Sequence, residues 1–462
     1  MLDVTSIFYV ISNQNAYEHW SIGRSMLQNV SLPLRYAPGG TMTPESGIEL
    51  GRAIASGHRC VAVVSDRMKS SRMMKETLIS GILSQGTDVM DAGCAPEPAA
   101  AYVARMCDCS VFVTESSVYG HLSGYRMFNK DGSPFTGEQV RHLSTISSGL
   151  KSPDHNDLGK RILYTRAVKD YNDYMASVLG EITGAPVVID CGCGAVAESA
   201  PQILTKAGIE VISINAHCDE DFVPKEPSAD TQEFEWLHDF ISNKEGCIGI
   251  GLDRIGSRAT VIDEDGDVVD PIKAMSMVVK ALRPKRMIAS MDTSSLVEMA
   301  FAENNVDGSE YLLSSRHIAD VASAMVKENA DLAVCGDRIL YKGLPAPDGI
   351  HTAAVISRIA NSESLKRMAE SMTALYRSSA CIRLECEDNI FVHALNERMK
   401  ESGGFRYACS DGWRVDMDEG WFLVGPPVES AVEIFAESTD KAYLIGLMET
   451  ATDLVKSCSR TQ

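Results

Sequence analysis

The chain contains 462 residues, which is too long for one hydrophobic core and predicts three or four domains of about 100–200 residues each. Its formal net charge is −20 and its lysines and arginines form no cluster, so nucleic acid is excluded as a partner. No apolar run approaches the ~20 residues that span a bilayer, and the first residues lack the pattern of a secretion signal. The 13 scattered cysteines fit free thiols in a reducing compartment. We therefore expect a cytoplasmic protein without a membrane partner.

In the first third of the chain, short β-branched runs alternate with segments of helical periodicity. A helix is expected to begin with Thr43 as its N-cap and Pro44 at its first position. The other predicted elements are strands at 60–64, 88–91 and 110–113 and helices at 70–84 and 97–106. This alternation predicts mostly parallel strands covered by helices.

Two further blocks repeat the alternation of strands and helices. The second block predicts strands at 186–190, 210–214 and 247–251, helices at 196–207 and 232–242, and a hairpin from residue 259 through an Asp265-Gly266 turn. The third block predicts strands at 287–291 and 332–335, and helices at 293–302, at 318–327 and after Asp348-Gly349.

The C-terminal segment departs from this alternation. Strands are predicted at 382–386, 413–417, 420–424 and 432–436, with helices at 389–400 and from about residue 440, which is typical of an antiparallel sheet. The predicted fold class is α/β, with three consecutive mixed-sheet α/β domains and a C-terminal α+β domain. A polar, proline-containing segment at 151–156 is a plausible linker, and the predicted domains are residues 1–158, 159–267, 268–366 and 367–462.

Two segments of the first block, 64–105 (beginning VSDRMKSSRMMKETL) and 113–128 (VTESSVYGHLSGYRMF), carry distinctive motifs, and DGWRVDMDEGWFLV follows at 411–424. Gly192 and Gly194 add a tight turn in the second block. Together these segments resemble the α-D-phosphohexomutases, the family of phosphomannomutase, phosphoglucomutase and phosphoglucosamine mutase. The likeness covers nearly the whole chain beyond its first forty residues. It implies the four-domain architecture of that family and a role in carbohydrate metabolism.

The resemblance also implies a catalytic apparatus, of which this chain keeps a part. In the family a serine carries the transferred phosphate, and Ser116 stands at that position, with Arg126 at the lysine that follows it. The family's DGDxDR loop holds Mg²⁺ through three aspartates, so Mg²⁺ is the cofactor that the resemblance implies. Here the loop reads DRIGSR, and it keeps only Asp253 and the final Arg258.

The side chains of this altered metal loop fit Mg²⁺ poorly. Mg²⁺ prefers near-octahedral oxygen ligands with carboxylates among them. Ile255 has no side-chain oxygen and Ser257 has a neutral one, so Asp253 is the single candidate metal ligand that remains. We expect Asp253 to pair with Arg254 or Arg258 instead.

The two substrate loops differ from the family pattern as well. The family's sugar loop, GGExSGH, corresponds here to a segment with Asp337 and Arg338, which are candidate substrate-binding residues. The family's phosphate loop, RPSGTEP, corresponds to residues 425–431, where Ser430 is a candidate. Pro426 and Pro427 lack the N–H groups that a phosphate cradle needs, so this loop is not expected to bind phosphate in the family's manner.

Each remaining candidate residue has one functional interpretation and one in which it plays no part in chemistry. Ser116 could be a nucleophile or a loop serine inherited with the scaffold, and His121 a general base or a solvated side chain. Arg126 and Arg258 could attract a phosphate or carboxylate, or could pair with acidic neighbours. The favoured hypothesis is a protein with lost or altered mutase activity. It would bind a hexose phosphate or another small anion, or act as a partner subunit of an active mutase paralogue or of a homo-oligomer. The alternative is a divergent active mutase or phosphatase that transfers phosphate through Ser116.

Overall fold

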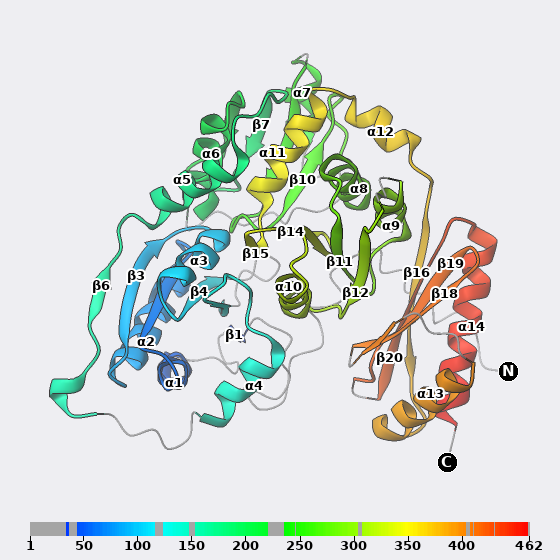
Figure 1. The fold of residues 1–462 in the computed structure, drawn as a ribbon, viewed down its shortest axis with the longest axis horizontal. Helices are drawn as coiled ribbons and strands as arrows, with labels where there is room; N and C mark the ends of the chain where they lie inside the picture. The colour runs from blue at the N-terminus through cyan, green and yellow to red at the C-terminus, as the bar shows by residue number, and fades with distance from the viewer. Residues whose placement is uncertain are drawn as a thin grey trace.

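The computed structural model contains four sheets, which follow one another along the chain and are flanked by helices (Figure 1). None of the helices within the described residues is long and apolar enough to cross a membrane. The structure describes residues 34–36, 44–115, 123–146, 153–219, 235–244, 246–303, 307–402, 407–409, 411–428 and 430–460.

The first sheet has six strands in the order β1-β5-β4-β2-β3-β6. Strands β4, β2, β3 and β6 run parallel, whereas β5 is antiparallel to β4 and β1 is antiparallel to β5. Its elements are β1 (Leu34–Tyr36), α1 (Pro44–Ala55), β2 (Cys60–Ser65), α2 (Lys69–Leu83), β3 (Asp88–Cys94), α3 (Glu97–Val103), a 3₁₀ turn (Ala104–Met106), β4 (Cys109–Glu115), β5 (Ser123–Asn129), α4 (Gly137–Ile146) and β6 (Arg161–Leu163).

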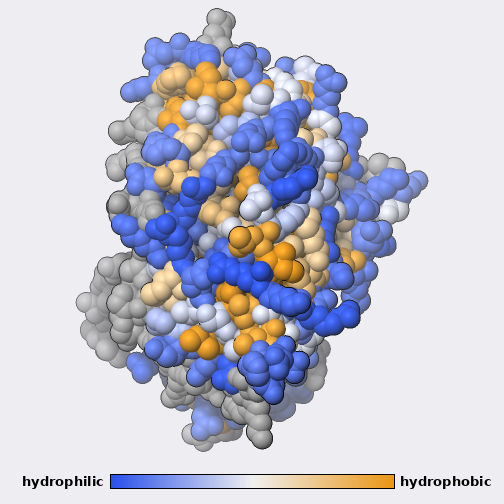
Figure 2. Space-filling view, turned by 90° about the vertical axis from the view of Figure 1, so that its left-hand side faces the viewer, coloured by the Kyte–Doolittle hydropathy of each residue, from blue (hydrophilic) through white to orange (hydrophobic). Residues whose placement is uncertain are grey.

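Strand β6 forms an edge of this sheet and lies just beyond the predicted domain limit at residue 158. Arg161 fastens it there, because its guanidinium pairs with Glu76 on α2 at 2.9 Å and with Asp91 on β3 at 2.5 Å. Ile162 and Leu163 are 52% and 69% exposed. Figure 2 looks onto this side of the molecule and shows hydrophobic patches separated by hydrophilic residues. The first sheet therefore extends past residue 158 and ends in an edge strand with apolar side chains in solvent.

The second and third sheets have the orders β10-β9-β7-β8 and β12-β11-β13-β14-β15. In each, a parallel core is extended by antiparallel strands on one side. The second group comprises α5 (Ala167–Leu179), β7 (Val187–Asp190), α6 (Ala200–Lys206), β8 (Val211–Ile214), α7 (Glu235–Ser242), β9 (Ile248–Leu252) and β10 (Ala259–Ile262). The third comprises α8 (Pro271–Leu282), β11 (Arg286–Ser290), α9 (Ser295–Ala302), β12 (Glu310–Ser314), α10 (Ile318–Lys327), β13 (Leu332–Cys335), β14 (Arg338–Tyr341), β15 (Leu344–Pro347), α11 (Gly349–Ala360) and α12 (Leu365–Ser371).

The fourth sheet is fully antiparallel, in the order β16-β20-β19-β18-β17. We call residues 376–460 the C-terminal unit; Figure 1 shows it in orange and red beside the third sheet. Its elements are β16 (Tyr376–Arg383), α13 (Asp388–Ser402), β17 (Tyr407–Cys409), β18 (Gly412–Met417), β19 (Gly420–Val424), β20 (Ala431–Ser438) and α14 (Lys441–Ser459).

The hydrophobic cores divide the molecule unevenly. One continuous cluster joins all of the first three sheets, for example through Ala62 on β2, Ile189 on β7 and Met287 on β11. The C-terminal unit has a core of its own between its sheet and helices α13 and α14. Because a shared apolar core resists relative movement, the first three sheets form one packed body and the C-terminal unit a second.

The predicted fold class, three mixed-sheet α/β units followed by an α+β unit, is confirmed. Helix α10 has the predicted bounds, and α11 begins at Gly349, one residue before the predicted start, with Asp348 as its N-cap. The strand predicted at 382–386 was misplaced: β16 spans Tyr376–Arg383, because its first half is polar and alternates toward solvent. The helix predicted at 196–207 is interrupted, because Pro201 has no N–H group and stands in the first turn of α6, after a separate 3₁₀ turn.

Candidate functional site

Three arginines from three different sheets come together between the first three groups of elements. Arg126 lies on β5, Arg258 on the connection between β9 and β10, and Arg338 is the first residue of β14. Burial, followed by the positive charges of Arg258 and Arg126, lowers the pKa of Arg338 from its ordinary value. We call these three residues the arginine cluster. Its members are close enough to repel one another, which makes it a place where an anion would be stabilised.

Acidic side chains partly balance the arginine cluster. Glu97, at the start of α3, forms an ion pair with Arg126 and is 4% exposed. Burial alone would lower the pKa of Arg126, but the charge of Glu97 and its hydrogen bond outweigh burial and raise it. Asp337 lies 3.5 Å from the Nε atom of Arg258. Two of the three arginines thus have an identified carboxylate partner.

Arg338 forms no ion pair with the carboxylates that the structure describes, although the nearby charges of Asp337 and Glu97 act on it. Its Nε atom is buried and has no hydrogen-bond partner among the residues that the structure describes. Asp337 precedes it in the turn between β13 and β14, where Gly336 has a φ of 59° that favours glycine. The turn positions Arg338 at the edge where the strands of the third sheet end. An oxyanion at this point would supply the missing hydrogen-bond acceptor.

The loop that contains Asp253 is held together by its own carboxylate. Asp253 Oδ1 accepts hydrogen bonds from the backbone N–H groups of Ser257 at 2.6 Å and Arg258 at 3.2 Å, and Oδ2 accepts one from the Ser257 hydroxyl at 2.5 Å. Burial raises the pKa of Asp253, and the nearby charge of Arg258 opposes that shift. Both oxygens of Asp253 are therefore engaged in folding the loop.

The predicted pairing of Asp253 is thus only partly what the structure shows. Arg258 contributes its backbone N–H and its charge, but Arg254 directs its guanidinium at the sulfur of Met68 on the first sheet's side. The Ile255 carbonyl accepts a hydrogen bond from the Glu97 backbone N–H at 2.8 Å. This bond ties the loop to α3, so that Glu97 and Arg258 reach the same region.

The residues of this loop do not fit Mg²⁺. Ile255 is a buried aliphatic side chain, the Ser257 hydroxyl donates to Asp253, and no second carboxylate stands in the loop. Within the described parts of the chain, no group of three or more His, Cys, Asp or Glu side chains could hold a metal ion. The positive charge at this site comes from guanidinium groups, which are permanently charged and need no metal.

In the predicted phosphate loop, several backbone N–H groups donate hydrogen bonds to nearby backbone carbonyls. The Gly425 N–H donates to the Glu433 carbonyl at 2.8 Å, and Val428 and Ala431 exchange two backbone hydrogen bonds at 2.8 and 2.9 Å. Ser430 sits in the resulting turn with a φ of 60° and is exposed. It belongs to a different turn from the one that holds Asp337 and Arg338. The hydrogen bonds and charges described above do not join it to the arginine cluster.

Ser116 and His121 lie outside the described residues, so their roles stay predictions. The two ends of that segment are placed: β4 ends at Glu115, and β5 begins at Ser123 and leads to Arg126. The Thr114 hydroxyl donates to Asp66 at 2.8 Å, which connects the end of β4 to the end of β2. The serine loop therefore starts and ends beside the strands that lead to the arginine cluster.

Glu97 is the site residue that the sequence analysis missed. It stands between Pro96 and Pro98 in the segment 64–105 that carries the resemblance. A single charged residue in the otherwise uncharged run CAPEPAAA was the available signal. Its ion-pair partner, Arg126, was among the predicted site residues.

Comparison with known proteins agrees with this architecture. The family models for phosphoglucomutase/phosphomannomutase, alpha/beta/alpha domains I and II, match residues 34–153 and 164–266. A phosphoglucosamine mutase from Methanococcus maripaludis is 27% identical over 434 residues, covering 90% of this chain and 96% of its own. A phosphoglucomutase/phosphomannomutase family protein from Burkholderia thailandensis superimposes with a TM-score of 0.78 at 19% identity, covering 93% of this chain and 96% of its own.

A more distant similarity is to a solved structure that contains magnesium. The N-acetylphosphoglucosamine mutase of Aspergillus fumigatus, solved in complex with GlcNAc-6P and magnesium, superimposes with a TM-score of 0.50 at 11% identity, covering 87% of this chain and 77% of its own. At that identity the similarity concerns the fold alone. The matched domain models, the nearly full-length relatives and the four-sheet architecture together show that this chain belongs to the α-D-phosphohexomutase family.

Proposed function

We propose that this phosphohexomutase-family protein has lost the magnesium-dependent mutase reaction and binds a hexose phosphate or another small anion at the arginine cluster. The observation that carries the proposal is the state of Asp253. Its two oxygens accept hydrogen bonds from Ser257 and Arg258, in a loop that keeps no other carboxylate. Phosphoryl transfer in this family's manner requires a metal to neutralise developing charge. Because the only carboxylate of this loop accepts hydrogen bonds within the loop itself, the site favours binding of an anion over transfer of a phosphoryl group.

The charge balance supports an anion as the ligand. Glu97 is paired with Arg126 and Asp337 lies beside Arg258, whereas the charges of these two carboxylates only partly offset the burial and repulsion that lower the pKa of Arg338. Its buried Nε atom offers a hydrogen bond that a phosphate or carboxylate oxygen can accept. Since guanidinium groups remain charged at every physiological pH, this binding should need no metal.

As a protein that binds without turnover, it would act as a ligand-binding or partner subunit in the cytoplasm. The partner is an active mutase paralogue or a second copy of this chain. The exposed edge strand β6, with Ile162 and Leu163, is an apolar surface available for such contact. Co-purification with a mutase at native expression level supports the paralogue, and a dimer mass in solution supports the second copy.

Calorimetric titration with glucose 1-phosphate and with inorganic phosphate tests the binding site. We expect the same affinity with EDTA as with magnesium. Arg338→Met should weaken binding by about 10- to 100-fold, because a hydrogen bond to a charged group contributes about 1.5–3 kcal/mol. Arg367→Met, at an exposed arginine on α12, is the matched control and should bind as the parent does.

Mutase assays with several hexose phosphates and phosphopeptide mapping of Ser116 test the loss of activity. The proposal is supported if no turnover is detected in the mutase assays and the anion binds equally with and without metal. Magnesium-dependent turnover with phosphate on Ser116 would overturn it in favour of a divergent active mutase or phosphatase.

A further inference from the structure

Two cysteines of the first sheet stand with their sulfur atoms in contact. Cys60 is the first residue of β2, and Cys107 lies between the 3₁₀ turn and β4. Their Sγ atoms are 2.7 Å apart, although the two residues are 47 positions apart in the chain. Both are free thiols, as are all 13 cysteines of the chain. We call Cys60 and Cys107 the thiol pair.

The backbone holds the thiol pair at the start of two neighbouring parallel strands. Val61 of β2 is paired with Cys109 of β4, and the Asp108 N–H donates to the Cys60 carbonyl at 3.0 Å. The Asp108 carboxylate accepts hydrogen bonds from the backbone N–H groups of Arg59 at 2.8 Å and Cys60 at 3.1 Å. Neighbouring strands lie about 4.8 Å apart and a disulfide joins Cα atoms about 4.4–6.8 Å apart, so the two sulfurs can bond with little movement of the backbone.

The two thiols differ in their exposure and in how firmly they hold their protons. Cys60 is partly exposed, whereas Cys107 is buried. Burial, followed by the hydrogen bond to Cys60, raises the pKa of Cys107, and the charges of Cys109 and Asp108 act in the same direction. Cys107 therefore keeps its proton and donates it in a hydrogen bond to the Cys60 sulfur. Since Cys60 is also the more exposed of the two, it is the sulfur that an oxidant reaches first.

A second thiol in contact changes what oxidation of a cysteine leads to. A sulfenic acid on an isolated cysteine persists or is oxidised further, whereas one beside another thiol condenses with it to a disulfide. Cys381 on β16 is the contrasting case: it is exposed, and no hydrogen bond within the described residues joins it to a second thiol. The thiol pair thus has both an accessible sulfur and a partner that can resolve its oxidised form.

We propose that the thiol pair is a redox-modification site, which a peroxide oxidises to a disulfide and a small dithiol reduces again. In the first step the Cys60 sulfur attacks one oxygen of hydrogen peroxide. An S–O bond forms, the O–O bond breaks, and the departing hydroxide takes the Cys60 proton and leaves as water, so that Cys60 becomes a sulfenic acid.

The second step joins the two sulfurs. The Cys107 sulfur attacks the Cys60 sulfur, an S–S bond forms, the S–O bond breaks, and the hydroxide takes the Cys107 proton and leaves as water. The thiol pair thus loses two electrons and two protons, and the peroxide becomes two molecules of water. On reduction the small dithiol is itself oxidised to a disulfide, which restores both thiols.

Limited oxidation of the full chain with hydrogen peroxide, followed by peptide mapping without reductant, tests the site. We expect a crosslinked peptide that joins Cys60 to Cys107 and that disappears on treatment with dithiothreitol. The disulfide restricts a span of 47 positions in the unfolded chain, so the oxidised protein should unfold at a higher urea concentration than the reduced protein. Cys381→Ser is the matched control and should form the same crosslink at the same rate.

Cys107→Ser separates the two steps, because it leaves Cys60 without a partner thiol. A sulfenic acid should then accumulate on Cys60 and be captured by dimedone. The central measurement uses the unaltered chain, so the proposal stays testable if this variant fails to fold. A crosslink from Cys60 to Cys109, or one that forms only in urea, would overturn the assignment. It would equally be overturned if Cys381 were oxidised in the folded chain while Cys60 and Cys107 remained thiols, or if the oxidised protein unfolded at a lower urea concentration than the reduced one.

Discussion

Replacing Asp348 with asparagine should stabilise the protein at alkaline pH, and the gain should shrink as the pH falls. Asp348 is 3% exposed and caps α11: Oδ1 accepts the His351 N–H at 2.9 Å, and Oδ2 accepts the Tyr171 hydroxyl at 2.9 Å. Burial nevertheless outweighs these hydrogen bonds and raises the pKa of Asp348 from 3.8 to about 6. The folded state therefore holds this proton more tightly than the unfolded chain does.

The sign and size of the effect follow from that difference. A raised folded-state pKa means that stability is highest below the unfolded value of 3.8 and is lost as the pH rises to about 6. The shift of about two units corresponds to a penalty of about 3 kcal/mol above pH 6 and of about 1 kcal/mol near pH 4.5. Asparagine is neutral and can still accept the His351 N–H. We expect Asp348→Asn to gain about 2 kcal/mol at pH 8 after subtracting a weaker cap.

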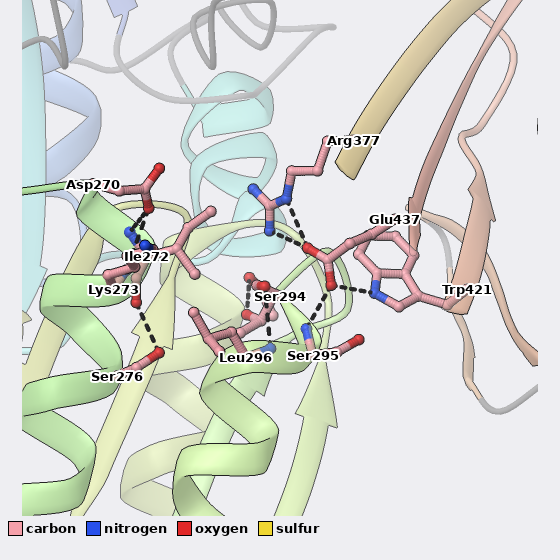
Figure 3. Close-up of polar contacts among 12 residues, drawn as sticks. Asp270, Ile272, Lys273, Ser276, Ser294, Ser295, Leu296, Arg377, Trp421 and Glu437 are labelled. Carbon is pink, nitrogen blue, oxygen red and sulfur yellow. Dashed lines mark hydrogen bonds and ion pairs between the residues drawn. The ribbon is translucent and has the colours of Figure 1, made fainter. Parts of the chain in front are cut away.

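The assay is urea unfolding followed by tryptophan fluorescence between about pH 4.5 and pH 8. Asp270→Asn is the control, because Asp270 caps α8 through the N–H groups of Ile272 and Lys273 at an exposed position (Figure 3). This control measures how much the free energy of unfolding falls when a helix cap is changed at a position that has no buried charge. The reasoning would be refuted if the difference in free energy of unfolding between Asp348→Asn and the parent stayed constant with pH. It would also be refuted if the variant became less stable than the parent as the pH rises.

Three further outcomes follow from single contacts. Ser257→Ala should lower the free energy of unfolding by about 1–3 kcal/mol in chemical denaturation, because it removes the hydroxyl that donates to the buried Asp253 at 2.5 Å; a change below about 0.3 kcal/mol would contradict this. Asp411 raises the pKa of His317 above 6.5, so this pair stabilises the fold at low pH, by less than about 1 kcal/mol because the ring is half exposed. His317→Gln should thus melt lower than the parent below pH 6 and equally at pH 9. Gly81→Ala should melt markedly lower, because a Cβ there would stand 2.2 Å from a backbone oxygen of α1, and an unchanged melting temperature would contradict that packing.

Helices with clear apolar periodicity or a recognisable start could be predicted from the sequence. Edge strands, which form by pairing with a neighbouring strand, could not. Helix α10 carries apolar residues at helical spacing along its whole length, and Asp348-Gly349 marks the start of α11. Strand β15 was missed because Pro345 and Pro347 argue against a strand, although they are tolerated where β15 forms the edge of its sheet. Strand β12 was missed because its middle residues are only partly buried at the opposite edge.

The candidate site was predictable as a list of residues but not as an arrangement. The resemblance placed Arg126 and Arg258 at family positions, since each follows a recognisable motif. It assigned no role to Glu97, and it could not show that both the backbone N–H and the hydroxyl of Ser257 would donate to the carboxylate of Asp253. These contacts depend on the way in which α3, the β9–β10 connection and β14 converge. That convergence is a property of the packed core and is not encoded in any short segment.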